Sequence, residues 1–486
     1  MSKRKQLGQF FTPEAVAKTL VRWAVRRDED RVLDPACGDG EFLSAHECAV
    51  GIELDAVHAA AARGRAPAAL VHEADFFAWA AQTHERFEAI VGNPPFIRYQ
   101  GFSGAMRARA LKQSAAFGAV LPQVTSSWAP FIAASSLLLK PGGRLAFVVP
   151  AEIGHASYAA PLLEALCAKF ERVAVVAVRE KLFAALSADA WLLYASGYGG
   201  RTGEVELSLH DAFAPSREPP APQHRIPLAS LRRSRGRLRR WLLPGDVREV
   251  YEHFEGSEAV HRLGSLATVG IGYVSGANGF FHVRPSEARR MRIPGCFLRV
   301  AVRRGGSLPA APSVTHRHVK SWLDADEPVL LLRIARDERR LPSAVRSYLD
   351  SPLGERARQA YKCRAREPWY AVPDVLVPDG FLTYMSGERV RIVRNAARCV
   401  ATNSVHVVRM KGTASFRALQ QGFESALSRL SCEVEGHPLG GGMLKVEPRE
   451  AQRILVPGPA ADAELRAARE VLERGSGELR RWRGYA

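Results

Sequence analysis

The first 200 residues alternate short apolar runs with stretches of helical periodicity. Residues 12–25, before the first of these runs, and residues 126–139, between two of them, are predicted to be helices. Strands that alternate with helices predict an α/β fold built on a parallel sheet. The predicted strands are 31–34, 49–53, 70–73, 89–92, 144–149, 172–178 and 191–196.

The second half of the chain has a different pattern. Residues 213–227 are rich in Pro, Ala and Ser, an arginine-dense stretch follows at 232–240, and beyond it short apolar runs alternate with glycine-rich turns. A chain of 486 residues is also too long for one ordinary domain. We therefore predict an α/β catalytic domain over 1–210, a linker and basic segment over 211–245, and a separate α+β domain over 246–486.

The net charge of the chain also changes at this boundary. Residues 1–210 hold 22 Lys and Arg against 21 Asp and Glu, whereas the remainder holds 46 against 29, so that +17 of the net +18 lies in the second half. This division favours catalysis in one part and polyanion binding in the other, with solvated arginine-rich faces as the alternative. The seven scattered cysteines form no CxxC pair and predict no metal site. No apolar run is long enough to span a bilayer, and we expect a cytoplasmic protein with no membrane partner.

A glycine-rich turn follows the first predicted strand. Residues 32–43 read Val-Leu-Asp-Pro-Ala-Cys-Gly-Asp-Gly-Glu-Phe-Leu. Glycines let the backbone pass close to a ligand at the carboxyl edge of a parallel sheet, where such folds bind nucleosides. A dinucleotide fingerprint needs a third glycine, and Leu43 stands in its place. A P-loop needs Gly-Lys-Ser/Thr, which this turn lacks.

Acidic residues follow the next two predicted strands. Glu53 ends the second strand, where a carboxylate can accept hydrogen bonds from both hydroxyls of a ribose. Asp75 and Phe76 follow the third, where an acid and a ring can hold an adenine. A helix N-cap is the alternative role for Asp34 and Asp75, and a core position for Phe76. Together and in this order, the residues predict a site for a nucleoside-containing cofactor.

The tetrapeptide Asn93-Pro94-Pro95-Phe96 follows the fourth predicted strand and so shares the edge of the glycine-rich turn. The exocyclic amine of adenine is a poor nucleophile because its lone pair is delocalised into the ring. The Asn93 side-chain oxygen and the Pro94 carbonyl can accept both amine hydrogens, and two prolines hold these acceptors in place. Phe96 can stack on a target base that has left the duplex. The alternative is a rigid turn with Phe96 in the core.

These residues, in this order, resemble the gamma class of DNA amino-methyltransferases, the TaqI-like N6-adenine enzymes. The resemblance begins at Gly-Gln-Phe-Phe-Thr-Pro, residues 8–13, and implies the Rossmann-like sheet of class I methyltransferases with S-adenosyl-L-methionine as methyl donor. It implies a catalytic motif of Asn93, Pro94, Pro95 and Phe96. It also implies that Phe183 is a second ring that stacks on the flipped base. The implied cofactor residues are Thr12, Asp34, Ala36 and Gly38 at the methionine, Glu53 at the ribose, and Asp75 and Phe76 at the adenine.

The second half resembles the recognition domains of the same enzymes at 270–278, 366–370, 402–406 and 440–448. This resemblance implies double-stranded DNA as the partner and target recognition by 246–486, and it leaves open a separately encoded cognate restriction endonuclease. Two departures stand out. Only about ten residues separate Gly40 from Gly51, which predicts a very short first crossover, and Ser127 stands where relatives often carry Asp.

Other functions remain open at this point. An Asn-Pro-Pro-aromatic motif also serves methyltransferases of RNA or of protein glutamine, but these generally lack Phe-Phe-Thr-Pro and a basic second half of this size. A DNA-binding subunit with a degenerate methyltransferase domain is disfavoured by the intact acidic residues and Asn93. The sequence favours site-specific methylation of adenine N6 in duplex DNA, in a restriction–modification or related system.

Overall fold

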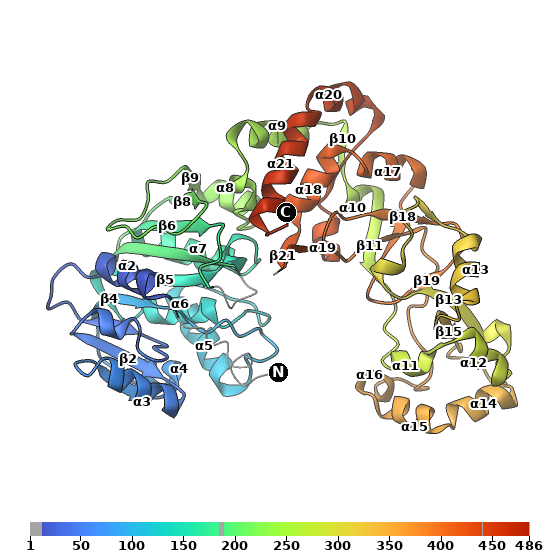
Figure 1. The fold of residues 1–486 in the computed structure, drawn as a ribbon, viewed down its shortest axis with the longest axis horizontal. Helices are drawn as coiled ribbons and strands as arrows, with labels where there is room; N and C mark the ends of the chain where they lie inside the picture. The colour runs from blue at the N-terminus through green and yellow to red at the C-terminus, as the bar shows by residue number, and fades with distance from the viewer. Residues whose placement is uncertain (1–11, 184–188, 440, 486) are drawn as a thin grey trace. The chain divides into compact units, whose positions relative to one another are not determined.

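The structure, a computed structural model, describes residues 12–183, 189–439 and 441–485. The chain divides into two compact units, Met1–Leu242 and Leu243–Ala486 (Figure 1). Of the predicted motif at 8–13, only Thr12 and Pro13 lie within the described residues.

The first unit is built on a nine-stranded sheet of order β3-β2-β1-β4-β5-β7-β6-β8-β9. The five strands from β3 to β5 are parallel, and β7 runs antiparallel to both of its neighbours. The central strands are buried along almost their whole length, as strands covered on both faces are. The strands are β1 Val32–Asp34, β2 Ala49–Glu53, β3 Leu70–Glu73, β4 Phe87–Gly92, β5 Leu139–Pro150, β6 Phe170–Val178, β7 Ala190–Tyr198, β8 Glu204–His210 and β9 His224–Pro227.

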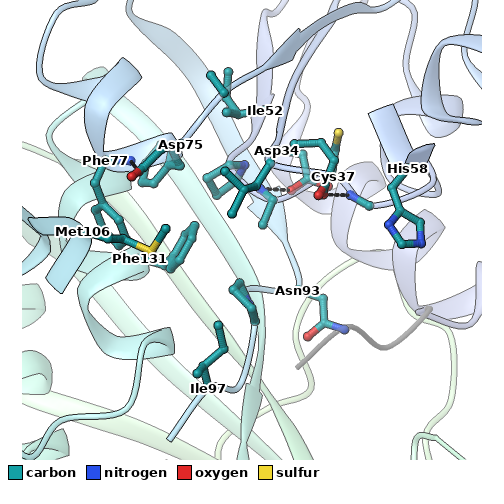
Figure 2. A pocket seen from close by; sticks show the side chains of 18 of the residues that line it. Asp34, Cys37, Ile52, His58, Asp75, Phe77, Asn93, Ile97, Met106 and Phe131 are labelled. Atoms are coloured by element: carbon teal, nitrogen blue, oxygen red, sulfur yellow. Dashed lines mark hydrogen bonds between the residues drawn. The ribbon is translucent and has the colours of Figure 1, made fainter. Parts of the chain in front are cut away.

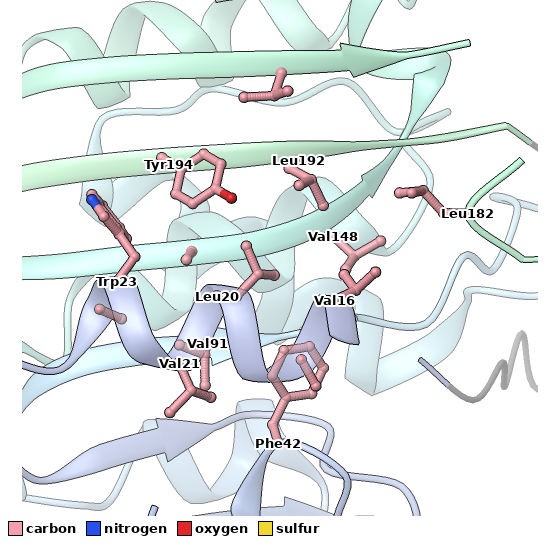
Figure 3. Close-up of a cluster of buried hydrophobic side chains, with 14 of the residues drawn as sticks. Val16, Leu20, Val21, Trp23, Phe42, Val91, Val148, Leu182, Leu192 and Tyr194 are labelled. Atoms are coloured by element: carbon pink, nitrogen blue, oxygen red, sulfur yellow. The ribbon is translucent and has the colours of Figure 1, made fainter. Parts of the chain in front are cut away.

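Helix α2 (Glu14–Ala24) covers one face of this sheet. Figure 3 shows Val16, Leu20 and Trp23 of α2 directed at the strands, where they meet residues such as Val148 and Tyr194. The indole of Trp23 lies edge-on to the Tyr194 ring at 4.9 Å between centroids. This packing fixes the start of α2, and with it Thr12, beside the carboxyl end of β4. The other helices of the unit are α3 Ala56–Arg65, α4 Phe76–Ala80, α5 Gly104–Phe117, α6 Trp128–Ser136, α7 Ala159–Cys167 and α8 Leu228–Arg233.

The predicted strands and helices of the first 200 residues are present, with longer strands in places. Strand β5 already begins at Leu139 and runs through the Lys-Pro-Gly-Gly sequence at 140–143, ahead of the predicted strand 144–149, and its pairing with β4 shifts register there. The crossover from β1 to β2 is very short, as predicted, with the single 3-10 turn η1 (Leu43–Ala45). The structure therefore confirms an α/β sheet of the class I methyltransferase type.

The segment 211–245 is not the linker that we predicted. Strand β9 pairs with β8, and Ile226 is fully buried. In the arginine-dense stretch, Arg232 pairs with Glu164 and Arg239 is only 2% exposed. Strand β9 is short and has little apolar sequence, which hid it, whereas β8 has the polar–apolar alternation of a half-buried strand and was missed despite this pattern. With the boundary at residue 242, the units carry +7 and +11, so both are basic.

The second unit is a mixed α+β structure, in line with the expected class. It contains a five-stranded sheet of order β11-β20-β16-β18-β14 and a four-stranded sheet of order β12-β15-β13-β19. A two-stranded sheet, β10-β23, and a three-stranded sheet of order β17-β22-β21 complete it. The strands are β10 Val260–Arg262, β11 Ala267–Ile271, β12 His282–Val283, β13 Leu298–Val302, β14 Ser313–Val314, β15 Leu330–Leu332, β16 Gly380–Leu382, β17 Met385–Ser386, β18 Ile392–Asn395, β19 Val400–Ala401, β20 His406–Met410, β21 His437–Leu439, β22 Met443–Lys445 and β23 Leu455–Pro457.

Helices surround these small sheets. Helices α18 and α21 pack together, and a buried ion pair between Arg483 and Glu433 joins their ends. Within the described residues, no helix of either unit is long and apolar enough to cross a membrane. The helices are α9 Gly245–Gly256, α10 Leu263–Leu266, α11 Asn278–Phe281, α12 Pro285–Arg290, α13 His316–Asp324, α14 Ser343–Leu349, α15 Pro352–Gln359, α16 Tyr361–Arg364, α17 Phe416–Phe423, α18 Ala426–Glu435, α19 Pro448–Ala451, α20 Asp462–Ala467 and α21 Arg469–Trp482.

Candidate active site

One cavity of about 310 Å³ lies at the carboxyl ends of β1 to β4 in the first unit (Figure 2). Its volume is in the range of small-molecule and cofactor sites. The structure brings most of the predicted site residues together in its wall. Those that line it are Thr12, Asp34, Ala36, Gly38, Glu53, Asp75, Phe76, Asn93 and Pro95.

Glu53 holds the glycine-rich turn in place. It ends β2 and is almost fully buried. Its Oε2 accepts a hydrogen bond from the Gly38 amide at 2.9 Å, and its Oε1 accepts one from the Asp55 amide at 2.8 Å. Each carboxylate oxygen has more than one acceptor site, so Glu53 can bind the turn and still accept from a ligand.

Asp34 ends β1 and carries an acceptor without a partner. Its Oδ1 accepts a hydrogen bond from the Ala36 amide at 3.0 Å, while its buried Oδ2 has no hydrogen-bond partner among the described residues. Burial, with the nearby Glu53 charge, raises the pKa of Asp34 to about 8. A buried carboxylate without a partner is costly and suits a cationic group of a ligand.

Asp75 and the aromatic rings form another part of the wall. Asp75 does cap a helix, since its Oδ1 accepts from the amides of Phe77 and Ala78 at the start of α4. Its Oδ2 accepts from Arg109 of α5 at 2.9 Å. Phe76 is buried and stacked on Phe131 at 5.2 Å between centroids. The alternatives of a cap and a core ring are thus realised, yet both residues line the cavity.

Figure 2 shows Phe77, Phe131 and Met106 grouped on one side of the cavity, away from Cys37 and His58. Two aromatic rings and a thioether make this side apolar, which suits contact with a planar ring of a ligand. The sequence analysis missed Met106 and Arg109, because α5 carries neither a motif nor a strong amphipathic pattern. Only the packing of α5 on α4 and α6 reveals that it closes the cavity.

Asn93 directly follows β4 and lies at the cavity edge (Figure 2). Its Nδ2 donates a hydrogen bond to Oγ1 of Thr12 at 3.2 Å, and this bond orients the amide. Thr12 was predicted at the methionine end of a cofactor. The structure adds that it positions the Asn93 side chain.

Ser127 holds the backbone of the segment that follows Asn93. This buried residue accepts a hydrogen bond from the Ile97 amide at 3.0 Å through its Oγ, which also donates to the Pro95 carbonyl. Its own amide donates to the Ile97 carbonyl at 3.0 Å. The departure noted in the sequence therefore keeps a polar group that holds the backbone after Asn93.

Pro94, Phe96 and Phe183 do not line the cavity. Pro94 is buried, while Phe96 packs against the core cluster beneath α2, which includes the buried Phe183. The structure thus brings the two proposed stacking rings into one cluster but leaves them in the core. A stacking role for either ring stays a prediction.

A parallel sheet that joins a glycine-rich turn, an acidic residue after the second strand and Asn-Pro-Pro at one edge defines a class I S-adenosylmethionine-dependent methyltransferase. Sequence comparison identifies the family within this class of methyltransferases. The chain belongs to the family described as Type II methyltransferase M.Eco57I, C-terminal domain, whose profile matches residues 236–480. The profiles of Eco57I restriction-modification methylase and of N-6 DNA Methylase match residues 56–178 and 1–63.

Individual relatives agree with this family. Type II methyltransferase M.XamI of Xanthomonas campestris pv. amaranthicola is 23% identical over 476 residues, covering 93% of this chain and 85% of that protein. Type II methyltransferase M.TthHB8I of Thermus thermophilus is 34% identical over 161 residues, covering 30% of this chain and 35% of that protein. The solved structure of the Type IIL enzyme MmeI with DNA shares the fold, with a TM-score of 0.55 at 12% identity, covering 96% of this chain and 72% of that one.

The chain is therefore an adenine-specific DNA methyltransferase of the restriction–modification type, with S-adenosyl-L-methionine as methyl donor. The cavity fits this cofactor on the structure's own evidence. The unpartnered Oδ2 of Asp34 suits an ammonium group, and a Cβ added to Gly38 meets no protein atom within 4 Å.

Cofactor affinity is expected to rise and then fall as the pH increases. In the cofactor-free protein Asp34 has a pKa of about 8, so it is mostly protonated at lower pH and must lose that proton to pair with a cation. The dissociation constant for S-adenosyl-L-methionine should fall by up to about tenfold per pH unit from about pH 6 toward pH 8, and rise again at higher pH, where the α-ammonium of the cofactor loses its proton with a pKa of about 7.7–8.0. Isothermal titration calorimetry measures it. Asp34→Asn should bind weakly with little dependence on pH, and an equally steep dependence in this variant would exclude Asp34 as the titrating group.

Two glycines of the turn are expected to respond differently to alanine. Gly40 has φ +87°, and an added Cβ would lie 2.9 Å from the Ala62 Cα, so Gly40→Ala should lower the free energy of unfolding by about 2–4 kcal/mol. Gly38 has φ +55° with open space around it, so Gly38→Ala should cost about 1 kcal/mol and mainly weaken cofactor binding. Denaturant unfolding and titration calorimetry separate the effects. Equal loss of stability in both would contradict the prediction.

Proposed function

We propose that this chain methylates N6 of an adenine flipped out of double-stranded DNA at a specific sequence, by the mechanism of the gamma-class enzymes. The observation that carries the proposal is the position of Asn93. It lies at the edge of the same cavity as Asp34 and Glu53, the residues suited to hold the cofactor. A target amine bound at Asn93 is thereby placed beside the methyl donor.

Asn93 and Pro94 prepare the target amine. The Asn93 side-chain oxygen and the Pro94 carbonyl accept its two hydrogens and draw the nitrogen toward a tetrahedral state with a free lone pair. Thr12 and Ser127 hold these acceptors in place through their hydrogen bonds to the Asn93 amide and the Pro95–Ile97 backbone. S-adenosyl-L-methionine supplies the methyl group on a positively charged sulfur, so attack by the amine leaves a neutral thioether and the amine then loses one proton to solvent.

Several residues of the cavity are proposed to hold the cofactor. Asp34, with Thr12, Ala36 and Gly38, takes the methionine end, and Glu53 accepts hydrogen bonds from the ribose hydroxyls. Asp75, held by Arg109, accepts from the adenine amine, and Phe76 contacts the ring. Phe96 and Phe183 stack on the target base once it enters, which requires both rings to leave the core cluster.

The second unit is proposed to recognise the DNA sequence. It carries +11 and contains an ordered loop within 270–278, where Arg366 donates hydrogen bonds to the backbone carbonyls of Val274 and Ser275. A rigid loop can hold side chains against base edges in a groove. A separately encoded restriction endonuclease that cuts the same unmethylated sequence would complete such a system.

Transfer of a labelled methyl group tests the substrate. Purified protein and labelled S-adenosyl-L-methionine are incubated with unmethylated duplex DNA, total RNA, or a protein extract freed of nucleic acid. We expect label in duplex DNA only, and none with the Asn93→Ala variant. Label confined to RNA or protein would exclude DNA as the substrate, and label independent of Asn93 would exclude the mechanism.

A further inference from the structure

A solvent-exposed turn follows the catalytic motif directly. Residues 98–100, Arg-Tyr-Gln, are all exposed, whereas Ile97 before them and Phe102 after them line the cofactor cavity. The turn closes on itself, because the amides of Gly101 and Phe102 both donate to the Arg98 carbonyl, at 2.9 and 3.1 Å. Three exposed side chains are therefore presented from a backbone anchored on both sides in the active site.

The backbone of this turn is held rigid by Arg107 of α5. Its guanidinium donates to the carbonyls of Tyr99 and Phe102, at 3.3 and 3.1 Å, and to the Gln123 side chain at 3.0 Å. Phe102 is 2% exposed and packs against Phe77. A fixed backbone lowers the entropy that is lost when exposed side chains bind a partner.

The chemistry of the turn matches a nucleic acid strand. The Arg98 side chain forms no hydrogen bond or ion pair with any residue that the structure describes, so its charge is available to an anion. Tyr99 exposes 41% of its surface, a large value for an aromatic residue held in a rigid turn. A cation and an aromatic ring side by side are what phosphates and bases require.

The position of the turn is also compatible with a contact to the DNA strand that carries the target base. Arg98 is five residues beyond Asn93, at most about 17 Å along an extended chain. A flipped nucleotide stays bonded to its two neighbours, and phosphates of one strand are spaced by only a few ångströms. The phosphates that flank the target therefore fall within reach of Arg98 when the base is at Asn93.

We propose that the turn 98–100 grips the DNA strand that carries the target adenine, with Arg98 on a flanking phosphate and Tyr99 stacked on a base exposed by flipping. This inference rests on the proposed function. It places a DNA contact in the catalytic unit, separate from the recognition assigned to the second unit.

Arg98→Ala tests the phosphate contact, and Arg86→Ala is the matched control. Arg86 is equally exposed but directly precedes β4, so it lies at the opposite edge of the sheet from Arg98. The Michaelis constant for unmethylated plasmid DNA is measured from about 50 to 200 mM NaCl. Loss of one phosphate contact should raise it about three- to tenfold and reduce the slope of its logarithm against log salt by about 0.9, whereas Arg86→Ala should leave both unchanged.

Tyr99→Ala tests the stacking contact, with Tyr99→Phe as the variant that keeps the ring. We expect about tenfold lower kcat/KM for DNA in Tyr99→Ala and near wild-type values in Tyr99→Phe. The dissociation constant for S-adenosyl-L-methionine without DNA should be unchanged in all four variants. This readout separates a DNA contact from damage to the cavity.

The DNA contact of the turn and the methylation of DNA are tested by different results. If the wild-type protein methylates DNA but Arg98→Ala keeps the wild-type salt slope, or behaves like Arg86→Ala, the turn does not bind a phosphate. If Arg98→Ala or Tyr99→Ala weakens cofactor binding without DNA, the turn acts on the cavity and the inference is wrong. Failure of the wild-type protein to methylate DNA at all would instead overturn the proposed function.

Discussion

Replacing Asn93 by alanine is expected to lower kcat by about a hundredfold or more while cofactor affinity stays within about threefold of wild type. The side-chain oxygen is proposed to act on the target amine mainly in the transition state, and loss of one preorganised group of this kind costs about 3–4 kcal/mol. Steady-state methylation of DNA gives kcat, and titration calorimetry gives the dissociation constant for S-adenosyl-L-methionine.

Thr12→Val provides a graded comparison. It removes the hydrogen bond that orients the Asn93 amide but leaves the catalytic oxygen in place. We expect about a tenfold loss of kcat, between wild type and Asn93→Ala. If Asn93→Ala lost cofactor binding and turnover in equal measure, Asn93 would belong to the cofactor site and not to the target site.

Glu53→Ala is expected to show the opposite pattern, with cofactor binding weakened about a hundredfold or more and kcat recovered at saturating cofactor. The buried carboxylate is proposed to accept two hydrogen bonds from the ribose, each worth about 1.5–3 kcal/mol with a charged acceptor. It also holds the amides of Gly38 and Asp55, so its loss loosens the glycine-rich turn. Calorimetry and methylation at increasing cofactor concentration measure both effects.

Glu53→Gln keeps the shape and one acceptor oxygen of the side chain. Its NH2 group cannot accept from the Gly38 or Asp55 amide, so one of these two bonds is lost and the free energy of unfolding should fall by about 1–3 kcal/mol, with intermediate affinity for the cofactor. A Glu53→Ala variant that binds the cofactor normally would show that the ribose is held elsewhere.

The sequence carried enough information for the centre of the fold and most of the cavity. Strands β1, β2 and β4 are short and mostly apolar, and Asp34, Glu53 and Asn93 lie at or directly after their carboxyl ends, while Asp75 lies two residues after β3. Since parallel strands place their carboxyl ends together, the order of Asp34, Glu53, Asp75 and Asn93 along the chain was sufficient to predict a shared site.

Other features depend on packing that no local pattern records. Arg109 reaches Asp75 across 34 residues and Ser127 reaches Pro95 across 32, so neither contact has a signal in spacing. The same is true of 211–245, where β9 is polar on one side and joins the sheet only through β8. Phe96 and Phe183 were predicted to stack on the target base, whereas in the structure they pack in or against the hydrophobic core. An aromatic residue near a motif can equally be a core residue, and the sequence pattern does not distinguish the two.

Identification of the methylated nucleoside tests the central claim most directly. Unmethylated duplex DNA is treated with the protein and S-adenosyl-L-methionine, digested to nucleosides, and analysed by liquid chromatography and mass spectrometry. The proposed adenine-N6 methylation predicts N6-methyldeoxyadenosine in the wild-type reaction and its absence with Asn93→Ala. Methylated cytosine in its place, or no methylated nucleoside from an enzyme that binds the cofactor, would contradict it.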